Sequence, residues 1–272
     1  MIELQEQSGL PLRWDPAKHS MEFFAPLQPV EPAVRRRVDM QEVLYDPRAD
    51  GPQELYYMYR GISLPRDTEE VERAGLRYDV TVLVPGQIGT EPVKTAGHYH
   101  PPQKGTPFTY PEIYEVLSGT AHYLLQRKNE QEEGRIEEVL LIEAHPGDKV
   151  LIPPGFGHIT INPTSEYLAM SNWVAAEFSS DYGPIRRFGG GAYFELWGQK
   201  GTEYIPNKNY QSVPPLRFLN PGEHTPLGLT RDITLYEMFH REREQLQCLV
   251  QPENFATEFE RYREAWKDKA YR

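Results

Sequence analysis

The sequence has a single cysteine, Cys248, among its 272 residues, so no disulfide bond can form within the chain. This low usage is typical of proteins in a reducing compartment. The sequence has no run of 18 apolar residues, the length that a membrane-spanning helix needs. Its first ten residues lack the basic and apolar stretches of a secretory signal. We therefore expect a cytoplasmic protein with no membrane partner.

Positive charge is also scarce. The chain carries 29 lysines and arginines against 40 acidic residues, which gives a net charge of −11 at pH 7. Such a chain repels phosphate backbones, so we expect no nucleic-acid partner. The one basic run, Arg35-Arg36-Arg37, is typical of salt-bridge partners at a solvated edge. Apolar residues make up 39 % of the chain, which is enough for a globular core.

Short β-rich runs fill the middle of the chain, separated by glycine, proline, asparagine or charged residues. The runs are Leu76–Pro85, Glu112–Leu117, His122–Lys128, Glu137–Ala144, Lys149–Pro153, His158–Asn162 and Tyr167–Ala175. An earlier aromatic run, Leu55–Tyr59, also predicts a strand. The polar stretch 129–135 predicts a hairpin tip. Many short strands at close spacing predict an all-β sandwich or barrel.

Helical patterns lie on both sides of this region. Asp39 and Glu42 predict a short helix with Asp39 as its N-cap, and Asp67–Ala74 predicts another. Apolar residues recur at helical spacing in Thr230–Val250 and in Pro252–Ala270. We expect these last segments to dock on the β body, with a dimer contact as the alternative. The predicted units are residues 1–76 (N-terminal strands and short helices), 77–210 (barrel) and 211–272 (C-terminal helical extension).

Two histidines, a glutamate and a third histidine form a candidate metal site. His98 and His100 are two residues apart, so in an extended segment both imidazoles reach the same side. Glu112 opens a predicted strand, and His158 follows a Pro-Pro-Gly turn. The intervening stretch 101–111 contains four prolines and a glycine, which predicts a loop.

Three imidazoles and one carboxylate suit Zn, Fe, Mn, Ni or Cu. Four such ligands in a barrel leave coordination positions open for water or substrate, as in a catalytic site. The alternative is a metal-free barrel with leftover polar residues. Ligand type alone does not identify the metal.

The spacing around these residues resembles the two cupin motifs. Six residues separate Glu112 from Gly119, and the second half contains Gly147, Pro153, Gly155, His158 and Asn162. A narrower resemblance follows from Gly89-Thr90-Glu91, Lys94–His100, Glu112-Ile113-Tyr114 and Pro153-Pro154. Together these residues resemble the cupin-type phosphoglucose isomerases over roughly residues 30 to 210.

This resemblance implies a mainly β, cupin (jelly-roll) barrel that interconverts glucose 6-phosphate and fructose 6-phosphate in glycolysis and gluconeogenesis. It implies one divalent metal per chain, with Fe as the first candidate and Zn, Mn or Ni as alternatives, and a homodimer. The implied metal ligands are His98, His100, Glu112 and His158, of which Glu112 and His158 are also the implied catalytic residues. The implied substrate contacts are Tyr56, Thr81, Thr95, Gly97 and Tyr182.

One departure from the family pattern and two reaction routes stay open at this point. Archaeal members carry a tyrosine where this chain has Val174, and valine cannot donate a proton. Glu112 is the candidate base for an enediol route, but a bound cation weakens a carboxylate as a base, and a metal-assisted hydride shift needs no base. Tyr114 is expected to line the barrel.

Two other functions compete with the isomerase. One is an iron-dependent dioxygenase, since the same ligand set serves that chemistry. The other is a non-catalytic sugar-phosphate-binding cupin. The stretch Lys94–Gly97 is compatible with a phosphate group and favours the isomerase. Fold alone does not decide, because one fold hosts many activities.

Overall fold

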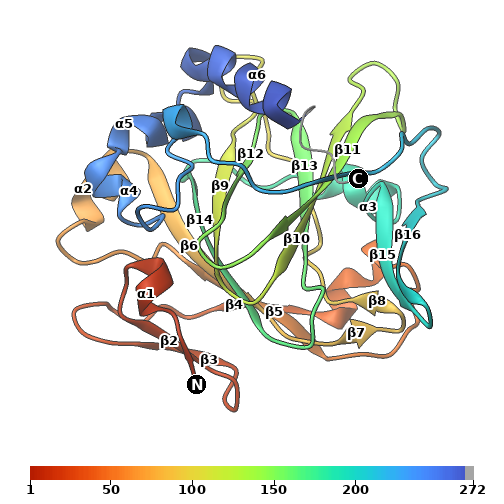
Figure 1. Cartoon of the computed structure of the whole chain (residues 1–272), viewed down its shortest axis with the longest axis horizontal. Coiled ribbons are helices and arrows are strands. Elements are labelled where there is room, and N and C mark those ends of the chain that lie inside the picture. The colour runs from red at the N-terminus through yellow and green to blue at the C-terminus, as the bar shows by residue number, and fades with distance from the viewer. Residues whose placement is uncertain (267–272) are drawn as a thin grey trace.

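Alternation of side chains along the central strands produces a barrel of two facing β-sheets. In β6 (Leu76–Leu83), Tyr78, Val80 and Val82 are fully buried on the outer side. Arg77 and Thr81 lie on the other side, which faces the barrel interior. The computed structural model describes residues 1–266, and both sheets are visible in Figure 1. The predicted mainly β barrel is confirmed.

The larger sheet has six antiparallel strands, and the smaller sheet has four, of which β11 and β17 pair in parallel. In spatial order, the larger sheet contains β12 (Lys149–Ile152), β9 (Glu112–Ser118), β14 (Leu168–Ala175), β6, β5 (Glu54–Arg60) and β4 (Ala33–Arg36). The smaller sheet contains β13 (Phe156–Ile161), β10 (Ala121–Lys128), β11 (Ile136–Ala144) and β17 (Arg217–Leu219). All the central strands predicted from the sequence are present, and β10 and β11 form the predicted hairpin around residues 129–135.

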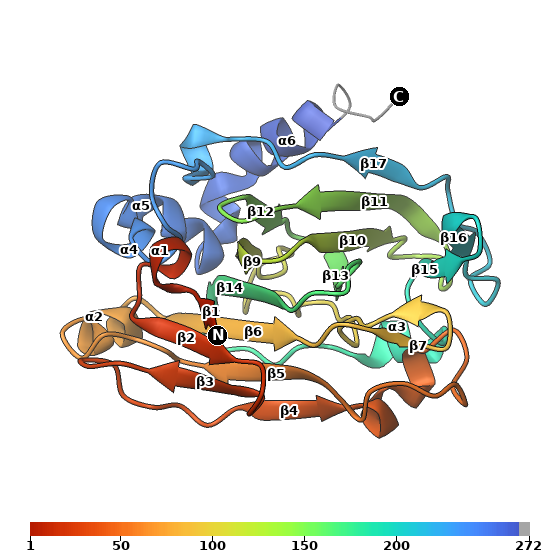
Figure 2. The same cartoon turned by 60° about the horizontal axis from the view of Figure 1, so that its bottom comes forward.

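Three small sheets and short helices surround this barrel (Figure 2). The small sheets are β1 (Ile2–Glu3), β2 (Leu12–Asp15) and β3 (Ser20–Phe23); β7 (Gln87–Ile88) and β8 (Glu91–Pro92); and β15 (Tyr193–Gly198) and β16 (Gly201–Pro206). The helices of the N-terminal and central parts are α1 (Gln5–Ser8), the 3-10 helix η1 (Arg37–Val43), α2 (Thr68–Arg73) and α3 (Gly183–Arg187). None of the helices within residues 1–266 has the length and apolar character that a membrane crossing requires.

The helix predicted near Asp39 exists, but its start was placed wrongly. It begins at Arg37, so Asp39 is the third helical residue and not the N-cap. The Asp39 carboxylate accepts a hydrogen bond from the backbone N–H of Arg36 at 2.9 Å. An acidic side chain in the first turn can therefore satisfy the N-terminal amides from the third position as well as from the cap.

The predicted helix Thr230–Val250 is broken into short pieces. They are α4 (Met238–Arg241), α5 (Arg243–Leu246) and η3 (Gln247–Leu249), and the 3-10 helix η2 (Thr225–Leu227) precedes the segment. A buried ion pair explains why no helix forms before Met238: Lys149 lies 3.0 Å from Glu115 and donates to the carbonyls of Thr230 and Ile233. The other Glu115 oxygen accepts from the Leu235 N–H at 2.6 Å. Backbone groups used in this way cannot form helical hydrogen bonds.

The last predicted helix, Pro252–Ala270, is observed as η4 (Pro252–Phe255) followed by α6 (Ala256–Ala265). Residues 267–270 of that prediction lie outside the described residues. Phe259, Tyr262 and Trp266 are buried, and the Trp266 ring contacts Phe156 of β13 at 5.6 Å between centroids. The apolar stripe of this segment therefore packs on the β body, as expected.

A buried histidine fastens the β15–β16 hairpin to the smaller sheet. His122 on β10 bonds Glu195 on β15 at 2.7 Å and Glu143 on β11 at 3.2 Å. Burial alone lowers the pKa of His122, but the hydrogen bonds and charges of the two carboxylates outweigh it and raise the pKa above its ordinary value of 6.5.

This arrangement predicts a pH-dependent contribution to stability. A raised folded-state pKa stabilises the fold fully below pH 6.5, and the contribution is lost as the pH rises through the folded-state pKa. We expect the free energy of unfolding of the wild type to fall more steeply between pH 6 and pH 9 than that of His122→Gln. Denaturant unfolding at both pH values measures the difference. Parallel curves for the two proteins would contradict this role of His122.

Candidate metal centre

The two histidines of the His-Tyr-His segment reach one point because the chain is extended there. Backbone hydrogen bonds in both directions join His98 to His158 of β13, at 3.2 and 3.0 Å. The imidazoles of His98 and His100 lie on the same side, with their Nε2 atoms 3.1 Å apart. The intervening Tyr99 points the other way and accepts a hydrogen bond from Gln126. The predicted alternation therefore holds.

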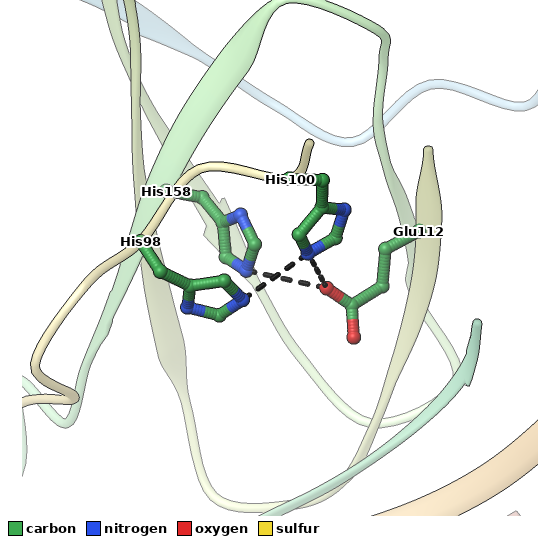
Figure 3. Close-up of side chains that lie close together, drawn as sticks. All are labelled: His98, His100, Glu112 and His158. Carbon is green, nitrogen blue, oxygen red and sulfur yellow. Dashed lines mark hydrogen bonds and ion pairs between the residues drawn. The ribbon is translucent and has the colours of Figure 1, made fainter. Parts of the chain in front are cut away.

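Glu112 and His158 complete a four-residue cluster inside the barrel (Figure 3). Glu112 is the first residue of β9, and His158 lies in β13 of the facing sheet. One ligand atom from each of the four residues lies within 4.8 Å of all the others. His100, Glu112 and His158 are each at most 5 % exposed. The loop 101–111 brings the chain back from His100 to β9, as its prolines predicted.

The hydrogen bonds around His100 show that the cluster fits a cation. Nδ1 of His100 lies 2.7 Å from the backbone carbonyl of Tyr110. A carbonyl only accepts, so Nδ1 carries the proton and Nε2 of the neutral ring presents a lone pair. That lone pair faces Oε2 of Glu112 at 3.3 Å, and Oε2 has no hydrogen-bond donor. Two buried acceptors in contact need a positive charge between them, which a metal ion supplies.

Protonation tendencies in the cluster also suit metal binding. Burial, together with the neighbouring histidines, lowers the pKa of His98 well below 6.5, and burial lowers that of His158 as well. Burial raises the pKa of Glu112, but its close contacts with His100 and His158 outweigh burial and bring the pKa well below its usual range. Neutral imidazoles and an ionised carboxylate are the forms in which these side chains coordinate metals.

Aromatic rings enclose the cluster on two sides. Phe178 lies 4.4 Å from the His100 ring and stacks on Tyr110 at 4.9 Å between centroids. The hydroxyl of Tyr114, two residues after Glu112 on β9, lies 3.2 Å from Nε2 of His158. The loop 101–111 and the segment after β14 therefore cover the site together. An apolar cover lowers the local dielectric and strengthens electrostatic interactions inside.

Comparison with known proteins identifies the family. The sequence profile of glucose-6-phosphate isomerase (GPI) matches residues 34–212, which include all four residues of the cluster. The chain belongs to the glucose-6-phosphate isomerase family. The glucose-6-phosphate isomerase of Thermococcus litoralis is 32 % identical over 164 residues, which is 58 % of this chain and 76 % of the relative. That of Pyrococcus furiosus is 31 % identical over 165 residues, or 58 % and 77 % of the two chains.

Other matches cover less. The glucose-6-phosphate isomerase of Thermococcus gammatolerans is 36 % identical over 122 residues, and the matched stretch spans 44 % of this chain and 58 % of that relative. A solved structure of an oxalate oxidase covers 49 % of this chain and 58 % of the other at 16 % identity, with a TM-score of 0.35. A TM-score this low establishes no shared fold or function.

Two of the residues that the family resemblance implies as substrate contacts lie close to the cluster. The Tyr182 ring is 5.4 Å from that of His98. The hydroxyl of Tyr56 accepts a hydrogen bond from the Ala96 N–H at 3.2 Å, so it lies against the segment that leads to His98. The side chain of Thr95 accepts from the backbone N–H of Thr160 at 2.9 Å, which leaves the hydroxyl proton available to donate.

Gly97 and Thr81 occupy positions with clear structural roles. Gly97 has φ = +73°, and a Cβ there would lie 2.4 Å from Cγ1 of Ile159. The fold therefore requires glycine at this position, whether or not a substrate approaches. Thr81 lies on the inner face of β6, opposite Met58 of β5 and Met170 of β14. The structure brings it into the barrel wall.

Within the stretch Lys94–Gly97, the lysine is not presented to the site. Lys94 is buried and lies 2.5 Å from Glu91, and it also donates to the carbonyl of Val43. Lys94 forms a backbone β-bridge with Ile161, whose side chain is on the outer face of β13. The Lys94 side chain therefore also points away from the barrel interior. Its charge is already neutralised there.

Val174, the position at which the resemblance implies a tyrosine, lies in the wall of the site. On β14 it is directly opposite Glu112 of β9 on one side and Arg77 of β6 on the other. Arg77 forms a two-pronged ion pair with Asp79, whose carboxylate is buried. The inner face next to Glu112 therefore carries a guanidinium–carboxylate pair.

Proposed function

We propose that this chain is a metal-dependent glucose-6-phosphate isomerase that interconverts glucose 6-phosphate and fructose 6-phosphate. The observation that carries the proposal is the buried cluster of His98, His100, Glu112 and His158, which lies inside the stretch matched by the family. The named relatives catalyse this reaction, as their names state. The sequence resemblance, the family match and the geometry all concern the same four residues.

The ligand set supports one divalent metal per chain, with Fe as the first candidate and Zn, Mn and Ni as alternatives. A metal held by these four residues would supply Lewis-acid polarisation of the sugar oxygens at the reacting carbons. His100 is oriented for this by the Tyr110 carbonyl, which fixes its tautomer. The low exposure of the cluster excludes bulk water from the reacting carbons.

Two routes fit the residues around the reacting carbons. In the enediol route Glu112 removes a proton from one carbon and returns it to the other. In the hydride-shift route the hydrogen moves directly, and Glu112 only holds charge. Tyr114 has a pKa well above 10, raised first by burial and then by the charge of Glu112, so its hydroxyl stays protonated and can donate. Reaction in D2O separates the routes, because only the enediol route incorporates deuterium into the product.

The proposed contacts of the sugar phosphate are Tyr56, Thr81, Thr95, Gly97 and Tyr182. Hydroxyl and backbone N–H donors near Thr95 and Gly97 suit phosphate oxygens.

A homodimer and the division of the chain at residues 76 and 210 stay predictions. Sedimentation of the purified protein tests the first, and expression of residues 77–210 alone tests the second.

The experiment that tests the activity follows glucose 6-phosphate formed from fructose 6-phosphate with an NADP-dependent dehydrogenase. It is run on the protein as purified, after EDTA treatment, and after addition of Fe²⁺, Mn²⁺, Ni²⁺ or Zn²⁺. We expect turnover that EDTA abolishes and at least one metal restores. Unphosphorylated fructose is the matched control and should turn over far more slowly. Bound metal without turnover of fructose 6-phosphate would overturn the assignment, and oxygen consumption would then point to a dioxygenase.

A further inference from the structure

Three consecutive arginines on and after β4 differ sharply in their surroundings. Arg36 forms an ion pair with Glu54 at 3.5 Å, and Arg37 forms one with Asp50 at 3.0 Å. Both fit the expected solvated edge. Arg35, between the sheet and the site, forms no ion pair with any carboxylate in residues 1–266. Its Nε is buried, and no acceptor within that range bonds to it.

The position of Arg35 explains this difference. It pairs across the strands with Tyr56 of β5, so both side chains lie on the same face of the sheet. Its guanidinium carbon lies 6.0 Å from the centroid of the Tyr56 ring and 5.6 Å from that of Tyr182. Stacking on aromatic faces holds a guanidinium in place without neutralising its charge. Arg35 therefore keeps an oriented positive charge that no ion pair within residues 1–266 neutralises.

The two tyrosines connect Arg35 to the metal centre. The Tyr182 ring lies 5.6 Å from the guanidinium carbon of Arg35 and 5.4 Å from the His98 ring, and the Tyr56 hydroxyl lies against Ala96. Arg186 also lies over Tyr182, at 5.4 Å, but it is paired with Glu42 and more exposed. Of these two cations, Arg35 is the one that has no carboxylate partner among residues 1–266 and whose Nε donor is buried and unpaired.

We propose that Arg35 binds the phosphoryl group of the sugar-phosphate substrate and so selects phosphorylated sugars. This inference rests on the proposed function. The phosphate of a hexose 6-phosphate is at the opposite end of the molecule from C1 and C2, so its binding group must lie apart from the metal ligands but near the site. Arg35 meets that requirement, because it packs against Tyr182, which in turn packs against the ligand His98. A guanidinium also presents paired N–H donors that match phosphate oxygens, and the rest of this acidic chain repels such an anion.

The test compares Arg35→Gln and Arg35→Lys with Arg36→Gln, a neighbouring arginine whose partner is Glu54. We expect Arg35→Gln to raise KM for fructose 6-phosphate by about 10- to 100-fold, the range for loss of charge-assisted hydrogen bonds, with kcat changed by less than about 3-fold. The competitive inhibition constant of inorganic phosphate should rise by a similar factor. Arg35→Lys should fall in between, and Arg36→Gln should match the wild type.

Unchanged KM and phosphate inhibition in a folded Arg35→Gln protein would overturn the proposal, as would a loss confined to kcat. Calorimetric titration with inorganic phosphate separates this outcome from failure of the proposed function. Phosphate binding that Arg35→Gln abolishes, in a protein without isomerase turnover, would support Arg35 and refute the isomerase. Equal phosphate binding by both proteins would refute Arg35 whatever the activity.

Discussion

Replacement of His158 by alanine is expected to lower kcat/KM for fructose 6-phosphate by about 10³-fold or more, because a metal ion contributes several kcal/mol to transition-state stabilisation. His158 is 2 % exposed, and its Nε2 lies 3.3 Å from Oε2 of Glu112. Alanine offers no ligand atom there, so the bound metal should fall well below one per chain. Elemental analysis and the coupled assay measure the two losses on the same preparation.

His145→Ala is the matched control for this experiment. The His145 side chain is 53 % exposed on a turn after β11 and contacts only Glu143 and Asp148 among the residues 1–266. It should keep wild-type metal content and turnover. A folded His158→Ala protein that retains both would show that the cluster is not the catalytic centre.

Replacement of Lys149 by methionine is expected to lower the free energy of unfolding by about 3–5 kcal/mol, the range for breaking a buried ion pair. The Lys149 and Glu115 side chains are 1 % and 2 % exposed. Without the lysine, Glu115 stays buried without its cation, and the carbonyls of Thr230 and Ile233 lose their donor. The segment after residue 229 should therefore become more susceptible to protease.

The loss of stability in Lys149→Met should also depend on pH. Burial raises the pKa of Glu115 from 4.5 to about 7 even beside Lys149, and loss of the lysine raises it further. Because the folded-state pKa is raised, stability is retained at low pH and lost as the pH rises through that pKa. The penalty of Lys149→Met should thus be larger at pH 9 than at pH 6. Lys208→Met, at an exposed position, is the control, and an equally stable Lys149→Met protein would contradict the account.

The strands and the ligand set could be predicted because their causes are local. Each central strand alternates or is apolar throughout and ends at a turn residue, so its existence and approximate bounds follow from the sequence. The metal cluster could be predicted because His98 and His100 share a side in any extended segment, and Glu112 and His158 lie in recognisable spacing.

Other features depend on segments far apart in the chain. Thr230–Val250 has a helical pattern, but Lys149 and Glu115 bond the backbone of its first residues, which therefore form no helix. Lys94 has the local signal of a phosphate ligand, yet Glu91 holds it outside the barrel.

Two contributors to the site had no usable local signal. The carbonyl of Tyr110 fixes the His100 tautomer, and the sequence does not single it out because every residue has a backbone carbonyl. Arg35 could be told from its two neighbours only once Tyr56 and Tyr182 were placed beside it.

The most direct test of the central claim is a metal titration of the stripped protein. EDTA-treated protein is titrated anaerobically with Fe²⁺ while the conversion of fructose 6-phosphate is followed. We predict that isomerase activity starts near zero, rises in proportion to the added metal and reaches a plateau at one metal per chain. Full activity in protein shown by elemental analysis to be metal-free would contradict it.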